Sequence, residues 1–146
     1  MSSRKSGRRP RPGARTAPPG PPGPCPCGSG TPFGDCCGRA HGGRPAATAE
    51  ALMRSRYSAF VVGDAGYLLR TWHPATRPAR LDVEGTADGP RWTGLEILTT
   101  TGGSAFHAEG TVAFRAHYTT ADGPGVQEEH SRFLRHEGLW VYHSAL

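Results

Sequence analysis

The stretch CPCGSGTPFGDCC, residues 25–37, contains all four cysteines of this 146-residue chain. Their spacing is C-x-C-x8-C-C, with Cys25 and Cys27 at one end and the adjacent Cys36 and Cys37 at the other. In a reducing compartment, thiols this close together hold a metal ion more often than they form disulfides. Zinc prefers four sulfur or nitrogen ligands in a tetrahedron. The spacing therefore predicts a structural zinc site in which all four cysteines are ligands.

Two further features of this stretch concern how the site would close. Pro26 restricts the backbone, whereas Gly28 and Gly30 permit the positive φ angles of a tight turn, and we expect their amides to hydrogen-bond to the thiolates. The two adjacent cysteines can bind one ion only if the backbone bends between them. If Cys37 points away, His41 is the substitute fourth ligand. A redox-active dithiol is the alternative to a metal site.

The same residues closely resemble the SEC-C motif, a small zinc-binding knuckle that is also found at the C-terminus of the SecA translocase motor. The final pair there is commonly Cys-His, so the resemblance implies that Cys37 takes the fourth ligand position. It also implies that the metal is zinc, with iron as an accepted substitute. Knuckles of this family contact proteins such as the SecB chaperone and the ribosome, which implies a protein partner.

The residues before the knuckle form a basic tail. Residues 1–24 contain six of the 17 Lys and Arg residues and no acid, so the rest of the chain is close to electroneutral despite the net charge of +5. The tail is rich in proline and glycine and has almost no large apolar side chain, which predicts a disordered arm. Its contact with nucleic acid, a ribosome or an anionic lipid is a weaker alternative to a plain linker. With no signal peptide or membrane span expected, we predict a cytoplasmic protein.

A first helix is expected after the knuckle. Thr48 can cap its start, and Gly63 ends it. Arg54 and Arg56 fall on its other faces, outside the apolar one. The apolar face is predicted to carry Leu52, Met53, Tyr57, Phe60 and Val61.

A short second helix follows and carries Tyr67, Leu68 and Leu69. Asp64 is a good cap for it, and the pair His73-Pro74 is expected to stop it. The residues from 75 to about 90 have no periodic pattern and are expected to be irregular.

The hydrophobic period then changes from helical spacing to two. Strands are predicted at 92–101, 104–118, 126–136 and 139–143. Ser131 and Phe133 should share a face of the third of these strands. One face of 104–118 is predicted to carry Phe106, Ala108, Gly110, Val112, Phe114, Ala116 and Tyr118.

Two helices followed by antiparallel strands predict an α+β domain, with the helices on the apolar concave face of a bent sheet. The segments MRSRYSAF at 53–60 and TWHP at 71–74 resemble the YchJ-like family of bacterial proteins. That resemblance implies a cystatin-like or nuclear-transport-factor-two-like cone behind a SEC-C knuckle. The expected organisation is a tail at 1–24, a knuckle at 25–43 and a cone at 44–146.

Cone folds of this type often enclose a pocket between helices and sheet. The candidate pocket residues are Tyr57, Tyr67, Trp72, His73, Glu129 and Ser131. A carboxylate and an imidazole in such a pocket can do acid–base work. The plainer interpretation is that the aromatic residues are core, that His73 ends a helix and that Glu129 lies on a strand surface.

These patterns support one main hypothesis on function and two alternatives. The main hypothesis is a zinc-binding adaptor whose cone binds a protein or a small ligand. The first alternative is a small-molecule hydrolase or isomerase that uses Glu129 and His73. The second is a ribosome- or RNA-associated factor. No nucleophile elbow, phosphate loop or dinucleotide fingerprint occurs in the sequence.

Overall fold

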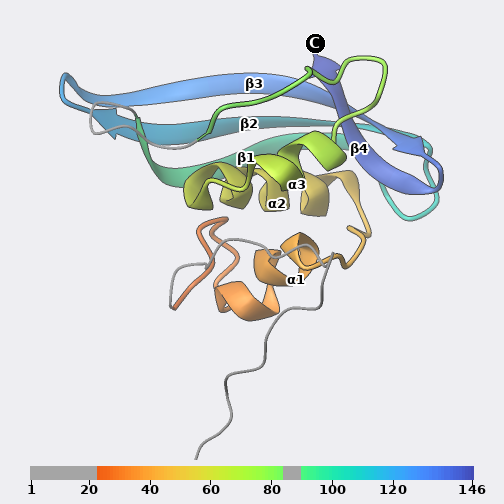
Figure 1. Ribbon diagram of the computed structural model, residues 1–146, viewed down its shortest axis with the longest axis horizontal. Helices are drawn as coiled ribbons and strands as arrows, with labels where there is room; N and C mark the ends of the chain where they lie inside the picture. Colours follow the sequence, from red (N-terminus) through yellow and green to blue (C-terminus); the bar gives the residue numbers. More distant parts are fainter. Residues whose placement is uncertain (1–22, 84–89) are drawn as a thin grey trace, which may run out of the picture.

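The computed structural model of the chain describes residues 23–83 and 90–146. The elements are η1 (Phe33–Asp35), α1 (Cys37–His41), α2 (Ala49–Val62), α3 (Ala65–Arg70), β1 (Arg91–Gly102), β2 (Glu109–Thr120), β3 (Gly123–His136) and β4 (Leu139–Ala145). The strands form one antiparallel sheet in the order β1-β2-β3-β4. In Figure 1 the sheet lies on one side of α2 and α3, and the knuckle with α1 lies on the other side. The predicted α+β class, with helices packed on an antiparallel sheet, is confirmed.

Helix α2 begins and ends where the sequence predicts. The side chain of Thr48 accepts a hydrogen bond from the Ala51 amide, and Gly63 closes the helix with a φ of 80°. Asp64 caps α3 by accepting from the Tyr67 amide.

The second helix ends at Arg70, before the predicted stop at His73-Pro74. The cause is a pairing distant in sequence. The Tyr142 amide donates to the Thr71 carbonyl, and the His73 amide donates to the Tyr142 carbonyl. Trp72 thus lies beside β4 as a parallel bridge, and strand-like hydrogen bonds replace the last helical turn.

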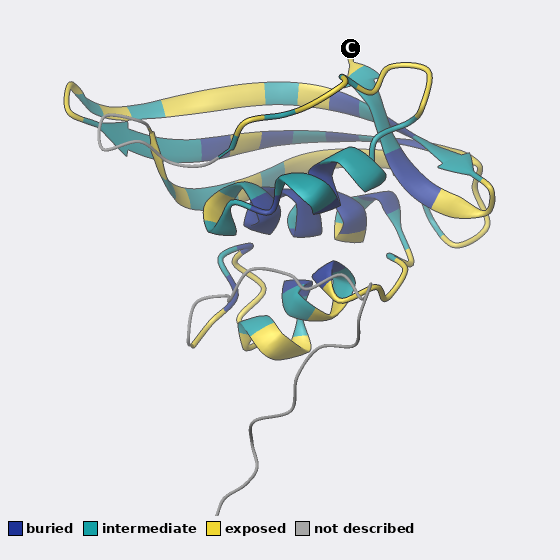
Figure 2. Cartoon of the chain, viewed as in Figure 1, coloured by how far each residue is buried: buried dark blue, intermediate teal, exposed yellow. Residues whose placement is uncertain are grey.

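Two expectations for α2 are wrong. Val61, expected on the apolar face, is 36% exposed. Arg56, expected on another face, is only 4% exposed and lies in the interior. Buried residues occur around most of α2 because the helix is covered from both sides, by the sheet and by the knuckle (Figure 2).

The second strand starts later than the alternation predicts. β2 begins at Glu109, and Phe106, expected on its apolar face with Ala108, is 97% exposed. Residues 104–107 instead form a turn in which the His107 amide donates to the Ser104 carbonyl. From Gly110 to Ala116 every second residue is buried, as expected.

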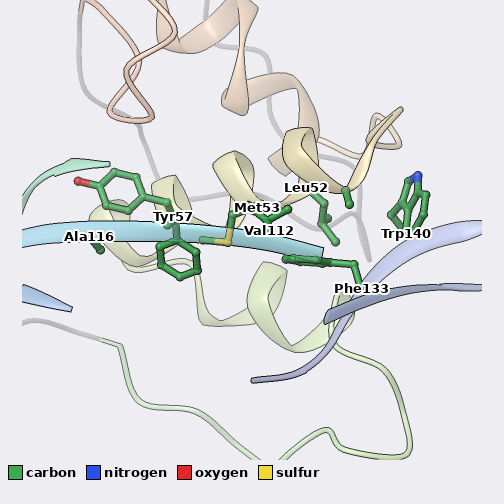
Figure 3. Close-up of a cluster of buried hydrophobic side chains, with 9 residues drawn as sticks. Leu52, Met53, Tyr57, Val112, Ala116, Phe133 and Trp140 are labelled. Atoms are coloured by element: carbon green, nitrogen blue, oxygen red, sulfur yellow. The ribbon is translucent and has the colours of Figure 1, made fainter. Parts of the chain in front are cut away.

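The core lies between α2 and the concave face of the sheet. Phe133, with 0% exposure, is at its centre, and Ser131 is buried on the same face of β3 as predicted. Figure 3 shows side chains from α2, β2, β3 and β4 meeting in this layer. The cluster consists of Ala49, Leu52, Met53, Tyr57, Val112, Phe114, Ala116, Phe133 and Trp140.

The predicted tail and the predicted irregular stretch both extend beyond the described residues. The tail at 1–24 falls outside the described residues except for Gly23 and Pro24. These two belong with the knuckle, because Pro24 pairs with Pro32 and the Phe33 amide donates to the Gly23 carbonyl. Part of the irregular stretch, residues 84–89, also falls outside. Among the described helices, none is long and apolar enough to cross a membrane.

Candidate metal centre and cone cavity

The four cysteine sulfur atoms converge on one point. All four Sγ atoms lie within 4.8 Å of one another. Cys25, Cys27 and Cys37 are at most 4% exposed, and Cys36 is half-buried. The first pair comes from a turn in which the Gly28 amide donates to the Cys25 carbonyl, and Gly28 and Gly30 have φ angles of 83° and 85°. The second pair comes from the junction of η1 and α1.

A bend in the backbone lets the two adjacent cysteines reach the same point. Cys36 lies between η1 and α1 with a φ of −127° and a ψ of −112°, and Cys37 is the first residue of α1. His41, the proposed substitute ligand, lies outside the sulfur group. Its Nε2 donates to the Ser55 carbonyl oxygen at 2.8 Å, and its ring packs 4.6 Å from that of Tyr67.

The dimensions of the sulfur group fit zinc. A tetrahedron with Zn–S bonds near 2.3 Å has sulfur atoms about 3.8 Å apart. The Cys27 and Cys36 sulfur atoms are 3.7 Å apart. Four sulfur donors with a mostly buried setting are also the donor set of closed structural zinc sites rather than of catalytic ones. The four sulfur atoms, all within 4.8 Å of one another, are therefore close to the arrangement that a metal ion such as zinc requires.

The pKa values of three of the four thiols are shifted, and not in the same direction. A hydrogen bond from Cys37 lowers the pKa of Cys27 to about 4, against the opposing effect of burial. The same hydrogen bond, together with burial, raises the pKa of Cys37, and burial raises the pKa of Cys36. One thiolate held by neighbouring S–H donors is the arrangement that a metal cation would stabilise in place of those protons.

Two side chains of α2, neither of them predicted from the sequence to contact the cysteines, hold the knuckle. Nη1 of Arg54 donates to the Cys27 carbonyl oxygen at 2.7 Å. Ser58, with 0% exposure, has its Oγ 3.5 Å from the Cys25 sulfur and also hydrogen-bonds to Cys37. Arg54 and Ser58 are four residues apart, on one face of the helix, which is the signal that identifies the pair once the knuckle is known to pack there. The Gly28 amide, expected to bond to a thiolate, donates instead to the Cys25 carbonyl, and the Ser29 amide contacts the Cys27 thiolate.

A separate cavity of about 200 Å³ lies between α2 and the sheet. Four of the predicted pocket residues, Tyr57, Trp72, Glu129 and Ser131, line it. The remaining wall is formed by Met53, Arg56, Phe60, Trp92, Phe114, Ala116, Gln127 and Tyr142.

The other two pocket candidates lie elsewhere. Tyr67 lies outside the cavity wall, and its hydroxyl is 2.6 Å from the Ser55 hydroxyl of α2. His73 lies near the surface, with its ring 5.2 Å from the rings of His136 and His143. The carboxylate–imidazole pair of Glu129 and His73 is therefore not assembled in this cavity.

Arg56 is the cavity residue that the sequence pattern assigned to a different environment. Its Nη1 donates to the Leu68 carbonyl and to the Thr71 hydroxyl, and its guanidinium packs over the rings of Trp72 and Tyr142. Burial lowers the pKa of Arg56 to about 10, which leaves it charged at neutral pH. Arg56 is four residues after Leu52 and four before Phe60, so helical spacing places it on the apolar face, and only its charge argues against burial.

Comparison with known proteins agrees with this geometry. The pattern of the YchJ middle NTF2-like domain matches residues 48–145, and the SEC-C motif matches residues 24–39. The chain belongs to the YchJ-like family. A UPF0225 protein of Streptomyces coelicolor is 64% identical to this YchJ-like chain over 120 residues, covering 82% of the chain and 91% of the relative. A UPF0225 protein of Corynebacterium glutamicum is 52% identical over 119 residues, covering 81% and 92%.

Two solved structures share the fold of the YchJ-like chain. A SEC-C motif containing protein from Rhodopseudomonas palustris, solved in solution, superposes with a TM-score of 0.70 at 31% identity, covering 84% of this chain and 96% of that one. The crystal structure of a SEC-C motif containing protein from Psychrobacter arcticus gives a TM-score of 0.63 at 29% identity, with 82% and 80% covered. The knuckle and the cone thus occur together in these neighbours.

Proposed function

We propose that this chain is a zinc protein in which the metal locks the knuckle onto α2, so that knuckle and cone present one joint surface to a protein partner. The observation that carries the metal assignment is the convergence of four cysteine sulfur atoms within 4.8 Å. All four coordination positions are filled by protein, so the zinc is structural and does not take part in a reaction.

The packing of the knuckle supports a bracing role. Arg54 and Ser58 of α2 contact the metal-binding turns directly, and Arg70 of α3 donates to the His41 carbonyl oxygen at 2.7 Å. A motif that only bound a metal would not require hydrogen bonds to two helices of the neighbouring domain. Fixing the orientation of the knuckle relative to the cone lowers the entropy lost when a partner binds both.

The part of the knuckle that faces away from α2 supports partner binding. The turn at Gly28, Ser29 and Gly30 is exposed, as are Gly34 and Asp35, while the sulfur ligands behind them are buried. A rigid turn with accessible backbone groups is suited to hydrogen bonding with another polypeptide. The partner is expected in the reducing cytoplasm, where the thiols stay available to the metal.

Elemental analysis tests the metal site. Freshly purified reduced protein should contain one zinc per chain, and Cys36→Ser and Cys37→Ser should each lose most of it, because a serine oxygen replaces a sulfur ligand. Asp35→Asn removes one charge at the exposed residue beside Cys36 and should leave the zinc content unchanged. Retention of zinc by Cys37→Ser with its loss in His41→Gln would instead assign the fourth position to His41. Four titratable thiols and no metal in the reduced wild-type protein would overturn the proposal.

Affinity capture with the wild type and with the double variant Cys36→Ser/Cys37→Ser tests the adaptor role. We expect partners captured by the wild type to be missing from the double variant and present with Glu128→Gln, a change at an exposed residue of β3 away from the knuckle. Identical partner lists for the wild type and the double variant would separate the metal site from partner recognition.

A further inference from the structure

The cone cavity contains two opposite charges that are not paired with each other. Arg56 and Glu129 are the charged residues of its described wall, and no ion pair within 4 Å joins them. Arg56 is only 4% exposed and Glu129 is half-buried, and a buried charge such as that of Arg56 is normally neutralised by a direct partner. Both groups line the cavity, so a molecule bound there can lie between them.

Arg56 is fixed in place by contacts on one side of its guanidinium. Within the described chain both of its hydrogen bonds, to Leu68 and Thr71, use Nη1. The rings of Trp72 and Tyr142 lie against the guanidinium, with centroids 5.2 and 4.8 Å from Cζ. The remaining N–H donors of Arg56 are thus held in a defined orientation and are available to an acceptor.

Glu129 is oriented in a similar way from the sheet. Ser131 donates to its Oε2 at 2.6 Å, and the Tyr142 hydroxyl donates to the same oxygen at 3.1 Å. Burial and the neighbouring Glu129 raise the pKa of Tyr142 to about 12, so the phenol remains a donor at neutral pH. Because both protein donors use Oε2, the other carboxylate oxygen is available to a ligand.

The rest of the wall is largely apolar and aromatic. Tyr57, Phe60, Trp92 and Phe114 come from α2 and two strands, and Trp72 completes the set. The indole nitrogen of Trp72 is buried, and the described residues give it no hydrogen-bond acceptor. A buried donor without an acceptor is unfavourable and is explained when a bound molecule or a water supplies one.

We propose that this cavity binds a small molecule with an aromatic or apolar body and no net charge, which presents an acceptor to Arg56 and a donor to Glu129. The two wall charges already sum to zero, so a neutral or zwitterionic ligand leaves the site balanced. A singly charged ligand satisfies one group and brings an uncompensated charge into a low-dielectric cavity. The volume of about 200 Å³ limits the ligand to one ring system with a short polar chain.

Four probes with the same phenyl ring and similar chain length test this charge balance. They are phenylalanine (zwitterion), 3-phenylpropionamide (neutral), 3-phenylpropionate (anion) and phenethylamine (cation). Binding to the full zinc-loaded chain is measured by calorimetry and by the fluorescence of Trp72 and Trp92, which line the cavity. We expect the zwitterion or the amide to bind at least about tenfold more tightly than either singly charged probe. Each singly charged probe forms only one of the two charge-assisted hydrogen bonds that Arg56 and Glu129 offer.

A variant at Glu129 distinguishes recognition by the two wall charges from nonspecific apolar binding. Glu129→Gln gives the cavity a net positive charge, so we expect it to weaken phenylalanine about tenfold and to strengthen 3-phenylpropionate. Glu128→Gln is the matched control, since Glu128 is exposed and paired with Arg115 on the other face of the strand. It should leave all four probes unchanged.

Three outcomes would overturn the inference. Equal binding of all four probes would show an apolar slot without polar recognition. Preference of the wild type for a singly charged probe would contradict the charge balance. Failure of every probe to bind at millimolar concentration, with zinc content and folding intact, would show that the cavity is not a site for such molecules.

Discussion

Nη1 of Arg54 donates a 2.7 Å hydrogen bond to the carbonyl oxygen of Cys27, and so joins the middle of α2 to the backbone of the metal-binding turn. The same guanidinium forms an ion pair with Glu50, one turn earlier in the helix. Arg54 thus links the secondary structure of the cone to the geometry of the knuckle. Ser58, Ser55 and Arg70 make further hydrogen bonds from the helices of the cone to Cys25 and His41 of the knuckle.

Replacing Arg54 should destabilise both the cone and the knuckle. In Arg54→Met the Cys27 carbonyl loses its charged donor, so we expect the free energy of unfolding of the zinc-loaded protein to fall by about 1–3 kcal/mol. Chemical denaturation measures it. Arg39→Met is the control, because Arg39 forms a largely exposed ion pair with Asp35 and should contribute less than about 1 kcal/mol. Equal losses in the two variants would contradict a special role for Arg54.

Two phenylalanines in different surroundings test the assignment of the core. Phe133 is fully buried, so Phe133→Ala should lower the free energy of unfolding by about 3–5 kcal/mol, through lost burial and the cavity left behind. Phe106 is 97% exposed, so Phe106→Ala should change it by no more than about 0.5 kcal/mol. Thermal and denaturant unfolding check both values. A large effect at Phe106 would place it back on the buried face that the alternation predicts.

His41 should make stability depend on pH. Burial lowers the pKa of His41 below its ordinary value of 6.5, so the folded chain binds its proton less readily than the unfolded chain. The contribution of neutral His41 is therefore complete above pH 6.5 and is lost as the pH falls from there through the folded-state pKa. The slope from this group is at most about 1.4 kcal/mol per pH unit.

The variant His41→Gln isolates this effect from other acid-sensitive groups, including the thiolates. Glutamine can still donate to the Ser55 carbonyl but does not titrate in this range. We expect the difference in unfolding free energy between wild type and variant to shrink as the pH is lowered from 7 to 5. A difference that stays constant over this range would show that His41 is not the group concerned.

Removal of metal should loosen the knuckle selectively. A zinc chelator is expected to accelerate amide hydrogen exchange across residues 25–41, because the two turns that carry the cysteines lose the ion that joins them. The long paired strands β2 and β3 should keep their protection. The same chelator applied to Cys36→Ser should change nothing further. Uniform acceleration over the whole chain would mean that the metal also holds the cone together.

Local chemistry explains what could be predicted from the sequence. Thr48, Gly63 and Asp64 act through their own backbone neighbourhoods, so their capping roles are readable without tertiary information. The alternation at Val112 and Phe114 similarly identifies the buried face of β2. The close spacing of the cysteines was enough to predict that they group together, and the structure places all four sulfur atoms within 4.8 Å.

Contacts between distant segments explain what could not be predicted. The pairing of Trp72 with Tyr142 ends α3 early and turns His73 away from the cavity, and no pattern within residues 64–74 encodes it. The burial of Arg56 likewise depends on rings from another helix end and from β4. Helical periodicity records how apolar a face is, and it does not record which partner makes a charged side chain acceptable inside.

The position of α2 between sheet and knuckle limits which insertions and deletions this fold can accept during evolution. Inserting or deleting one residue between Met53 and Ser58 would rotate the rest of the helix by about 100°. Such a change would turn Ser58 away from the sulfur ligands and Tyr57 away from the core in a single step. Length changes should therefore accumulate in the loops and the tail, while the helix tolerates substitution only at constant length. Moved into another protein without this helix, the knuckle would lose its contacts with Arg54 and Ser58.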